Sequence, residues 1–372
     1  MRFGVNARRL AGQRLGVARY IEYLLRYWAE QTRADEQGVL YLREPLGEPD
    51  RPLTERYETH VLPPRPDGIL WENLRLPRAA RDVDVLFAPG YTSPLVYSGK
   101  TVVAIHSMNE VERGTHPWWY GVTYSPIYRL SALRSERVIV PSESTKADIV
   151  RHYGLPEAKV VVVPQGADES FRPLGDDELN RRTRRRWLGE DRPYILFVGK
   201  LSQRRNIPAL IRAFARARAE HDLPHALLLL GPDHLDLGIP ALAEQLGVGS
   251  DVVQNDGKVG SHDELVAAYN AADLYANASL YEGFSLTLVE ALSCGTPVVA
   301  TKRGALGEIA GDAALLVDEP SPEQLADAIG RVLTEPALRS DLRARGPRRA
   351  EAFRWRDTAQ QTLDVLREVA AA

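Results

Sequence analysis

The sequence predicts an α/β protein that contains two parallel β-sheets. Short, largely apolar runs rich in β-branched residues alternate with helical patterns from end to end. Such runs are typical of strands that are buried on both faces beneath covering helices. With 372 residues, the chain is long enough for two domains of ordinary size, each with its own core.

The predicted strands are listed here in chain order: residues 83–87, 101–105, 138–140, 159–163, 194–198, 227–230, 274–276, 297–300 and 314–317. Residues 166–193 are polar, charged and bracketed by prolines, which indicates the change of domain. A second boundary is predicted near residues 345–347, and residues 350–355 are predicted to open a final helix. No internal repeat and no low-complexity tract is evident.

Residues 281–301, YEGFSLTLVEALSCGTPVVAT, contain the most informative pattern in the chain. Ser285 is predicted to cap a helix whose apolar face includes Leu286 and ends at Gly295. A helix N-terminus carries unpaired N–H groups and a partial positive charge, which suit a phosphate. Glu282 precedes that end and Glu290 lies one turn inside it, so each carboxylate could accept hydrogen bonds from a sugar. Two glutamates at this spacing are also common on surface helices.

This segment resembles the donor-binding motif of the family-four retaining glycosyltransferases. In that family a glutamate and Gly-Phe precede a second glutamate and a Cys-Gly-Thr-Pro-Val-Val turn. The resemblance implies the GT-B architecture, with two Rossmann-like domains that face a central cleft and a C-terminal helix that returns to the first domain. We therefore expect an acceptor-binding domain at residues 1–170, a nucleotide-sugar-binding domain at 171–348 and the returning helix at 349–372.

Two cations are predicted to face the donor pyrophosphate. Gly199 and Lys200 follow the strand at 194–198, and Arg205 precedes the next helix. The family usually has arginine in the first place and lysine in the second. Here the order is reversed, so both positive charges are kept, but the guanidinium that can form two parallel hydrogen bonds stands in the second place. The resemblance implies catalytic roles for Lys200, Arg205 and Glu282, with Glu282 at the hexose and Glu290 at the ribose. A surface lysine and arginine are the alternative.

The first half of the chain carries further family-like positions. Gly16 and Arg19 lie in a stretch that resembles the family's Gly-Ile-Gly-Arg-Tyr loop, although the second glycine is alanine here. His106 follows the strand at 101–105, where the family commonly has His-Asp, and is expected near the reacting carbon. A flexible loop and a structural histidine are the alternatives. The sequence lacks G-x-G-x-x-G and P-loop patterns here, which disfavours NAD and ATP.

The remaining site residues are predicted by the same resemblance. The expected donor-binding positions are Gly16, Gly199, Lys258, Val259, Gly283, Phe284, Ser285, Leu286 and Glu290. The expected acceptor-binding positions are Arg19, Trp118, Trp119 and Tyr120. Aromatic faces stack on sugars and also sit at membrane interfaces, and simple packing beneath a loop is the alternative.

Composition and charge exclude several classes of function. The net charge is −3 and basic residues interleave with acidic ones, which argues against a nucleic-acid partner. The single cysteine, Cys294, excludes an internal disulfide and is predicted to be a small buried residue. The sequence shows no signal peptide and no apolar run long enough to span a bilayer, so we expect a cytoplasmic protein. Peripheral contact with the inner face of the membrane stays open.

The combined reading is a retaining, metal-independent hexosyltransferase. The expected partners are a nucleotide-sugar donor, with a mannose-like or glucose-like hexose, and a glycan, lipid-linked or small-molecule acceptor. We expect no cofactor and no metal site, because protein cations would stabilise the leaving phosphate. A sugar-nucleotide 2-epimerase of the same architecture and a non-catalytic sugar-nucleotide sensor are the alternatives.

Overall fold

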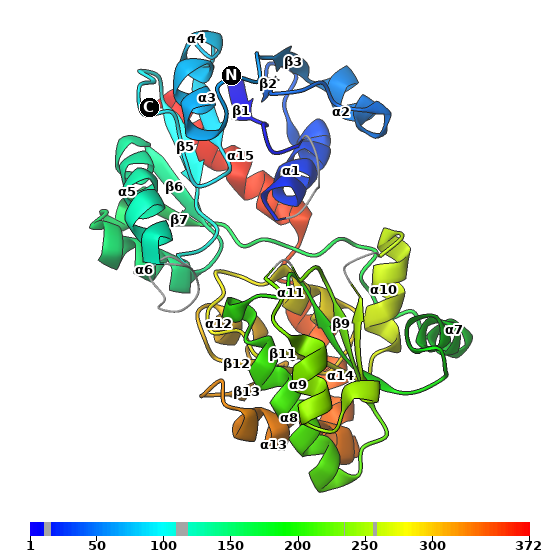
Figure 1. Cartoon of the computed structure of the whole chain (residues 1–372). Helices are drawn as coiled ribbons and strands as arrows, with labels where there is room; N and C mark the ends of the chain where they lie inside the picture. The colour runs from blue at the N-terminus through cyan, green and yellow to red at the C-terminus, as the bar shows by residue number, and fades with distance from the viewer. Residues whose placement is uncertain (11–15, 109–117, 234, 256–258) are drawn as a thin grey trace. The chain divides into compact units, whose positions relative to one another are not determined.

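The computed structural model describes residues 1–10, 16–108, 118–233, 235–255 and 259–372, with the backbone alone at residues 49 and 118–122. These residues form two compact units (Figure 1). The first unit comprises the described residues up to 165 together with 355–372, and the second comprises those from 166 to 354. Each unit contains one parallel sheet covered by helices, which confirms the predicted architecture.

The described part of the first unit holds a seven-stranded parallel sheet. Its strands, in spatial order, are β3 (Glu58–Val61), β2 (Gln37–Leu42), β1 (Arg2–Asn6), β4 (Val85–Ala88), β5 (Thr101–Ala104), β6 (Arg137–Val140) and β7 (Val160–Val162). From β1 the chain first winds toward β3 and then, from β4, in the opposite direction. The order therefore reverses between β1 and β4, and ligands of open parallel sheets bind at such a reversal, beyond the carboxyl ends of the strands.

The helices of the first unit lie between these strands in the chain, except the last, which follows the whole second unit. They are α1 (Val17–Gln31), α2 (Arg51–Arg56), α3 (Gly68–Leu74), α4 (Leu76–Ala79), α5 (Trp118–Arg134), α6 (Glu143–Tyr153) and α15 (Trp355–Ala371), with short 3₁₀ turns η1 (Glu48–Asp50) and η3 (Glu157–Lys159). Local sequence explains the ends of α6. The Ser142 hydroxyl accepts from the Thr145 N–H at 3.1 Å, and Gly154 closes the helix with a left-handed conformation.

The second unit, where described, holds a six-stranded parallel sheet with one comparable reversal. Its strands, in spatial order, are β10 (Val252–Asn255), β9 (Ala226–Leu230), β8 (Tyr194–Val198), β11 (Leu274–Asn277), β12 (Val298–Thr301) and β13 (Leu315–Val317). The order reverses between β8 and β11, so the carboxyl ends of these two neighbours mark the expected ligand edge.

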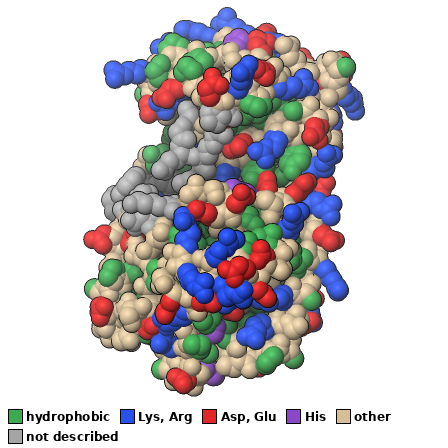
Figure 2. Space-filling view, turned by 90° about the vertical axis from the view of Figure 1, so that its right-hand side faces the viewer, with side chains coloured by type: hydrophobic (Ala, Val, Ile, Leu, Met, Phe, Trp, Pro, Cys, Tyr) green, Lys and Arg blue, Asp and Glu red, His purple; other side chains and the backbone are tan. Residues whose placement is uncertain are grey.

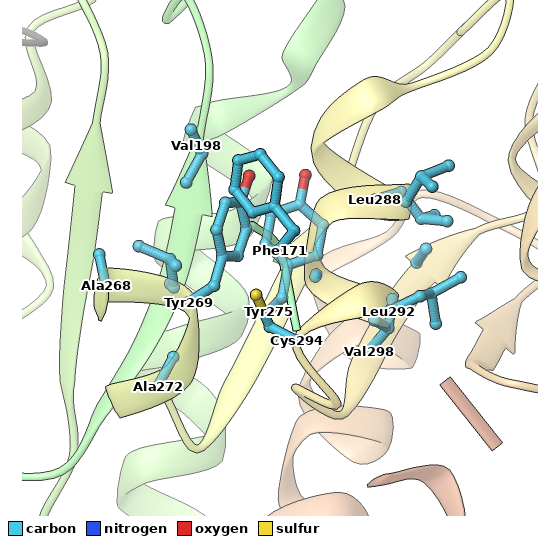
Figure 3. Close-up of a cluster of buried hydrophobic side chains, with 14 of the residues drawn as sticks. Phe171, Val198, Ala268, Tyr269, Ala272, Tyr275, Leu288, Leu292, Cys294 and Val298 are labelled. Atoms are coloured by element: carbon cyan, nitrogen blue, oxygen red, sulfur yellow. The ribbon is translucent and has the colours of Figure 1, made fainter. Parts of the chain in front are cut away.

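Helices cover both faces of this second sheet. They are α7 (Asp177–Leu188), α8 (Ile207–His221), α9 (Ile239–Gln245), α10 (His262–Ala271), α11 (Leu286–Ser293), α12 (Leu306–Ala310), α13 (Pro322–Thr334) and α14 (Pro336–Ala350), with 3₁₀ turns η4 (Gln203–Arg205) and η5 (Gly249–Asp251). Because strand side chains alternate, Leu196 and Phe197 lie in different clusters on opposite faces. Figure 3 shows part of one cluster, where the ring of Tyr269 contacts those of Phe171 and Tyr275, and the two tyrosine hydroxyls point to the same side.

The final helix, α15, packs on α1 in the first unit. The Trp28 indole N–H donates to the Ala359 carbonyl at 2.7 Å, and the guanidinium of Arg367 pairs with Glu36 at 2.8 Å. The boundary predicted near residues 345–347 is not a break, because α14 continues through it to Ala350. A Cβ at Gly346 would lie 2.8 Å from the Leu292 carbonyl oxygen, so this glycine permits close packing of α14 on α11.

Candidate functional site

The carboxyl ends of β8 and β11 bring the main predicted residues together in the second unit. Gly199 and Lys200 follow β8, and the segment from Ser279 to Glu282 follows β11. These two strands are neighbours in the sheet, although about 80 residues of chain separate them. The candidate site therefore lies where the chain order of the sheet reverses.

Glycines allow unusually close backbone approach around this edge. A Cβ at Gly231, just after β9, would lie 1.9 Å from the Gly199 carbonyl oxygen. Gly304 has a φ of 58°, and a Cβ there would lie 2.3 Å from the Glu282 carbonyl oxygen. That same oxygen accepts the Ala305 N–H at 2.8 Å. The backbone of the Glu282 loop is thus held against the turn that follows β12.

Glu282 is buried, with 5% of its surface exposed, and its carboxylate pairs with two arginines. Its Oε2 lies 2.8 Å from Arg204 Nη1, and its Oε1 contacts Arg205 Nη1. The Ser279 hydroxyl also donates to Oε1 at 3.0 Å. Arg204 Nη1 additionally donates to the Tyr281 carbonyl at 2.7 Å, which ties the loop to η4. Sequence reasoning identified Arg205 but missed Arg204, whose only signal was its adjacency to Arg205.

Arg205 has an unfilled hydrogen bond at this edge. Its Nε is buried and has no partner among the described residues. Burial, followed by the positive charge of Arg204, lowers the pKa of Arg205 to about 9. An unpaired buried N–H is costly, and an anion would satisfy it. The ammonium of Lys200 is exposed and, within the described part of the chain, has no ion-pair partner.

The start of α11 differs from the predicted cap. Ser285 is the residue before the helix, but its φ is 89° and its side chain makes no capping hydrogen bond. Its hydroxyl instead lies 3.5 Å from Asn277 Nδ2 and 3.5 Å from the Thr287 hydroxyl. The preceding Phe284 is buried, and its ring packs edge-to-face on Phe353 at 5.6 Å. That side chain anchors the loop in the core, while Leu286 is part-buried.

A network of polar side chains lies beneath the Glu282 loop. Asn277, the last residue of β11, accepts the Ser279 N–H at 3.0 Å through Oδ1. Its Nδ2 reaches the Tyr275 hydroxyl at 3.4 Å, and that hydroxyl lies 2.8 Å from the Thr287 hydroxyl. The network links the end of β11 to the first turn of α11. Sequence reasoning did not identify these residues.

Glu290 is almost fully buried, with 1% of its surface exposed. Its Oε2 accepts a hydrogen bond from the Tyr269 hydroxyl of α10 at 2.8 Å. Burial raises the pKa of Tyr269 well above its usual value, and the Glu290 charge adds to this. Tyr269 therefore remains a neutral donor that fixes the Glu290 carboxylate. The buried thiol of Cys294 lies in the same core, as predicted.

In the first unit, His106 follows β5 and both of its ring nitrogens have protein partners. Nε2 lies 2.7 Å from the Pro89 carbonyl, which can only accept, so Nε2 carries the proton. Gln165 Nε2 then donates to Nδ1 at 2.8 Å. Burial lowers the pKa of His106 to about 4, which favours this neutral form. Its ring also meets the Tyr20 ring edge-to-face at 4.7 Å.

The other predicted positions of the first unit surround the start of α1. Gly16 precedes the helix with a φ of 53°. Arg19 lies over the ring of Tyr23 at 6.0 Å, and Tyr23 stacks on Trp355 of α15 at 4.8 Å. Side-chain stacking thus ties the first turns of α1 to the returning helix.

Part of the predicted acceptor and donor set lies outside the described residues. Lys258 is one such residue, and Val259 next to it is part-buried. The side chains of Trp118, Trp119 and Tyr120 at the start of α5 are also outside the description. Further along α5, Tyr124 stacks on Tyr128 at 6.0 Å, and Tyr128 lies 5.4 Å from Tyr91, whose ring meets His106 at 5.5 Å.

Comparison with known families matches both units. Residues 180–349 match the model described as "Glycosyl transferases group 1", and residues 15–171 match "Glycosyltransferase Family 4". A D-inositol 3-phosphate glycosyltransferase of Kineococcus radiotolerans is 32% identical over 302 residues, which cover 76% of this chain and 68% of that protein. The chain belongs to the group 1 glycosyltransferase family.

A second relative of this chain is the D-inositol 3-phosphate glycosyltransferase of Rhodococcus opacus, which is 33% identical over 290 residues. The alignment covers 74% of this chain and spans 62% of the relative's length. Among solved structures, sucrose-phosphate synthase from Thermosynechococcus elongatus has a TM-score of 0.80 at 22% identity, covering 100% of this chain and 99% of that one. Anabaena HepE in complex with UDP-glucose has a TM-score of 0.79 at 17% identity, with 99% of each chain covered. These structures confirm the GT-B fold.

The described residues of this group 1 family member contain neither a metal-binding cluster nor a membrane-spanning helix. No group of three or more histidine, cysteine, aspartate or glutamate side chains is placed to hold a metal ion there. In the same residues, no helix is long and apolar enough to cross a membrane. Figure 2 shows basic and acidic side chains mixed over one face of the molecule.

Proposed function

We propose that this protein transfers a hexose from a nucleoside-diphosphate sugar to a glycan, lipid-linked or small-molecule acceptor. The observation that carries the proposal is the buried and unpartnered Nε of the part-buried Arg205, beside Glu282 at the sheet reversal of the second unit. The names of the glycosyltransferase relatives support it. A pyrophosphate oxygen would supply the partner that Arg205 lacks.

Lys200, Arg205 and the N-terminus of α11 are proposed to hold the donor pyrophosphate. Negative charge on the leaving phosphate grows as the glycosidic bond breaks, so these groups would stabilise the transition state more than the ground state. A divalent metal is then not required. We propose retention through same-face attack, in which the departing phosphate accepts the acceptor's proton.

Glu282 is proposed to position the donor hexose and Glu290 the ribose. A carboxylate offers about four acceptor sites, and Glu282 uses three of them for Arg204, Arg205 and Ser279. One site is left for a hexose hydroxyl. When Arg205 turns toward the phosphate, a second is released. Gly283, Phe284, Ser285 and Leu286 would shape this part of the donor site, and Lys258 and Val259 the base.

The first unit is proposed to bind the acceptor. His106 has both ring nitrogens engaged by Pro89 and Gln165, which favours a positioning role in the neutral form. Arg19 and the aromatic start of α5, with Trp118, Trp119 and Tyr120, are proposed to contact the acceptor. Gly16 would let backbone approach the donor phosphate. We place the protein in the cytoplasm, where contact with the membrane face would serve a lipid-linked acceptor.

A panel of UDP-, GDP- and dTDP-sugars in a thermal-shift assay tests the donor first, because a bound ligand raises the melting temperature. The selected donor is then incubated with and without acceptors, with and without EDTA. Conversion of the sugar without acceptor would identify an epimerase, and binding without any turnover would identify a sensor. The anomeric configuration of the product, read by NMR, tests retention, and loss of activity in EDTA would refute metal independence.

A further inference from the structure

Arg204 is tied to the Glu282 loop through both its main chain and its side chain. It belongs to η4, and its carbonyl accepts the Leu280 N–H at 2.9 Å. Its Nη1 donates to the Tyr281 carbonyl at 2.7 Å and lies 2.8 Å from Glu282 Oε2. Arg204 therefore holds three consecutive residues of the loop that follows β11.

Glu282 bridges two cations that otherwise oppose each other. Its Oε2 pairs with Arg204, and its Oε1 pairs with Arg205 through Nη1. Burial and, after it, the charge of Arg204 lower the pKa of Arg205, because two like charges are held close together. The glutamate is only 5% exposed, and a buried carboxylate that loses its counter-ion is strongly destabilising. Glu282 therefore needs at least one of these arginines in every state of the site.

A bound pyrophosphate would change this sharing. The Arg205 Nε is buried without a partner among the described residues, so a phosphate oxygen would draw Arg205 away from Glu282. Glu282 would then depend on Arg204, which stays on the loop because it also binds the Tyr281 carbonyl. If Arg204 were absent, the movement of Arg205 to the phosphate would leave a buried carboxylate unpaired, and donor binding would be weaker.

We propose that Arg204 is a positioning residue that remains the counter-ion of Glu282 when Arg205 exchanges this carboxylate for the donor pyrophosphate. The inference rests on the proposed function, because the pyrophosphate is that of the sugar-nucleotide donor. It adds a residue that acts on the donor through Glu282 rather than by touching the phosphate. Arg204 allows one cation to move while the glutamate stays charged and oriented toward the hexose.

Calorimetric titration of the full chain with UDP, GDP and dTDP, in buffer without phosphate, tests this exchange. Arg204→Gln should weaken binding of the preferred diphosphate roughly ten-fold, because Glu282 then resists the departure of Arg205. In a Glu282→Gln background the same substitution should change the affinity by less than about three-fold, since no buried carboxylate remains to be neutralised. Unchanged affinity in Arg204→Gln, or an equal loss in both backgrounds, would overturn the proposal.

Arg204→Lys separates the charge of this residue from the packing of the loop. The lysine keeps a cation beside Glu282, so this variant should recover most of the affinity that Arg204→Gln loses. Arg216→Gln is the matched control, because Arg216 is an exposed arginine of α8, the helix after η4, and pairs with Glu220 at 2.8 Å. A lysine variant that binds as weakly as Arg204→Gln would overturn the proposal, because the charge would then be unimportant.

Folding and donor binding are checked separately. Melting temperatures show which variants are folded. If Arg204→Gln alone does not fold, the Glu282→Gln protein is compared with the double variant, and a clear difference in diphosphate affinity between these two would overturn the proposal. If the wild-type chain binds none of the three diphosphates, the proposed function fails. Wild-type binding with equal losses in both backgrounds overturns only this inference.

Discussion

Glu282 is shared between two part-buried arginines, and this pairing changes what its substitution should do. The carboxylate neutralises Arg204 and Arg205, and it would compete for Arg205 with the phosphate proposed to bind there. Arg204 is bound to the Tyr281 carbonyl as well, so it stays with the loop. Arg205, with its unpartnered Nε, is the better placed of the two to change partner.

Glu282→Gln should therefore abolish turnover while affinity for the nucleoside diphosphate stays within a few-fold of wild type or increases. The amide keeps the size of the side chain but no longer holds Arg205 by charge. Calorimetry and steady-state kinetics, at a temperature where the variant is folded, measure both quantities. Glu319→Gln is the control, since Glu319 is an exposed carboxylate paired with Arg303. Near wild-type turnover would remove Glu282 from the mechanism.

Glu290→Ala should weaken binding of the free nucleoside diphosphate by roughly ten- to hundred-fold, the value of one charged hydrogen bond to the ribose. Tyr269→Phe should cause a smaller loss, because it removes only the bond that orients the carboxylate. Dissociation constants of the two variants, with melting temperatures as a check on folding, decide this. Unchanged affinity in a folded Glu290→Ala protein would mean that the roles of the two glutamates are assigned wrongly.

His106 predicts a pH dependence of stability with a definite sign. Its pKa in the folded protein, about 4, lies below the ordinary 6.5, so the unfolded chain binds the proton more readily. The contribution of His106 to the free energy of unfolding is complete above pH 6.5 and is lost as pH falls toward 4. The free energy of unfolding then changes by at most about 1.4 kcal/mol per pH unit. His106→Gln should flatten this part of the denaturation profile between pH 6.5 and 4. An unchanged slope would contradict the neutral assignment.

At the scale of elements, the loops at the strand ends set the geometry of the candidate site. Ser285 does not cap α11 with its side chain, because its left-handed backbone turns the hydroxyl toward Asn277 and Thr287. Phe284 in the core and Gly304 against the Glu282 carbonyl fix this turn. The loop is thus positioned by Asn277 at the end of β11, by Gly304 after β12 and by Phe353 after α14, together with Thr287 of the helix that it opens.

Gly304→Ala should displace the Glu282 loop and reduce both donor affinity and turnover. A Cβ there would lie 2.3 Å from the Glu282 carbonyl oxygen, and the φ of 58° is strained for alanine. Gly154→Ala is the matched control, with a φ of 69° and no atom within 4 Å of the new Cβ. It should cost only about 1 kcal/mol of stability, with unchanged binding. Equal binding by the two variants would show that the close approach is unimportant.

At the scale of the whole molecule, the C-terminal helix completes the first unit across more than 300 residues of chain. Arg367 of α15 hydrogen-bonds Glu36, and this holds the pKa of that carboxyl near 2. Because the pKa of Glu36 is lower in the folded protein than in the unfolded chain, the stabilisation from this ion pair is complete above pH 4.5 and is lost as pH falls toward 2. The ion pair therefore couples the last helix to the acid stability of the first unit.

Glu36→Gln should lower the melting temperature at neutral pH and reduce the loss of stability between pH 4.5 and 2. The lowered pKa of Glu36 corresponds to at most roughly 3 kcal/mol of the free energy of unfolding, and the partial exposure of Arg367 will reduce this value. Thermal denaturation across this pH range, compared with Glu30→Gln, measures the effect. Glu30 is a suitable control because it forms an exposed pair with Arg356 of the same helix. Identical acid profiles for wild type and Glu36→Gln would refute the coupling.

Local sequence was sufficient to predict the two sheets and most strands, because a strand buried on both faces needs a short apolar run wherever it occurs. Four strands, β1, β2, β3 and β10, were not among those predicted. The strands β3 and β10 form sheet edges and their side chains are at most part-buried, whereas β1 and β2 are interior and mostly buried, so burial does not account for these two. The Gly346-Pro347 pair predicted a boundary that the packing of α14 on α11 overrides.

The sequence alone predicted that Glu282, Glu290, Lys200 and Arg205 belong to one unit, because all four lie within the second expected domain, residues 171–348. Only the tertiary structure decided their partners. Strand order makes β8 and β11 neighbours, and this brings Arg204 and Arg205 onto a glutamate 77 residues away. Likewise, His106 is held neutral by Pro89 and by Gln165, 59 residues distant. Periodicity indicates which residues are buried, whereas charge pairing depends on which strand ends the sheet places side by side.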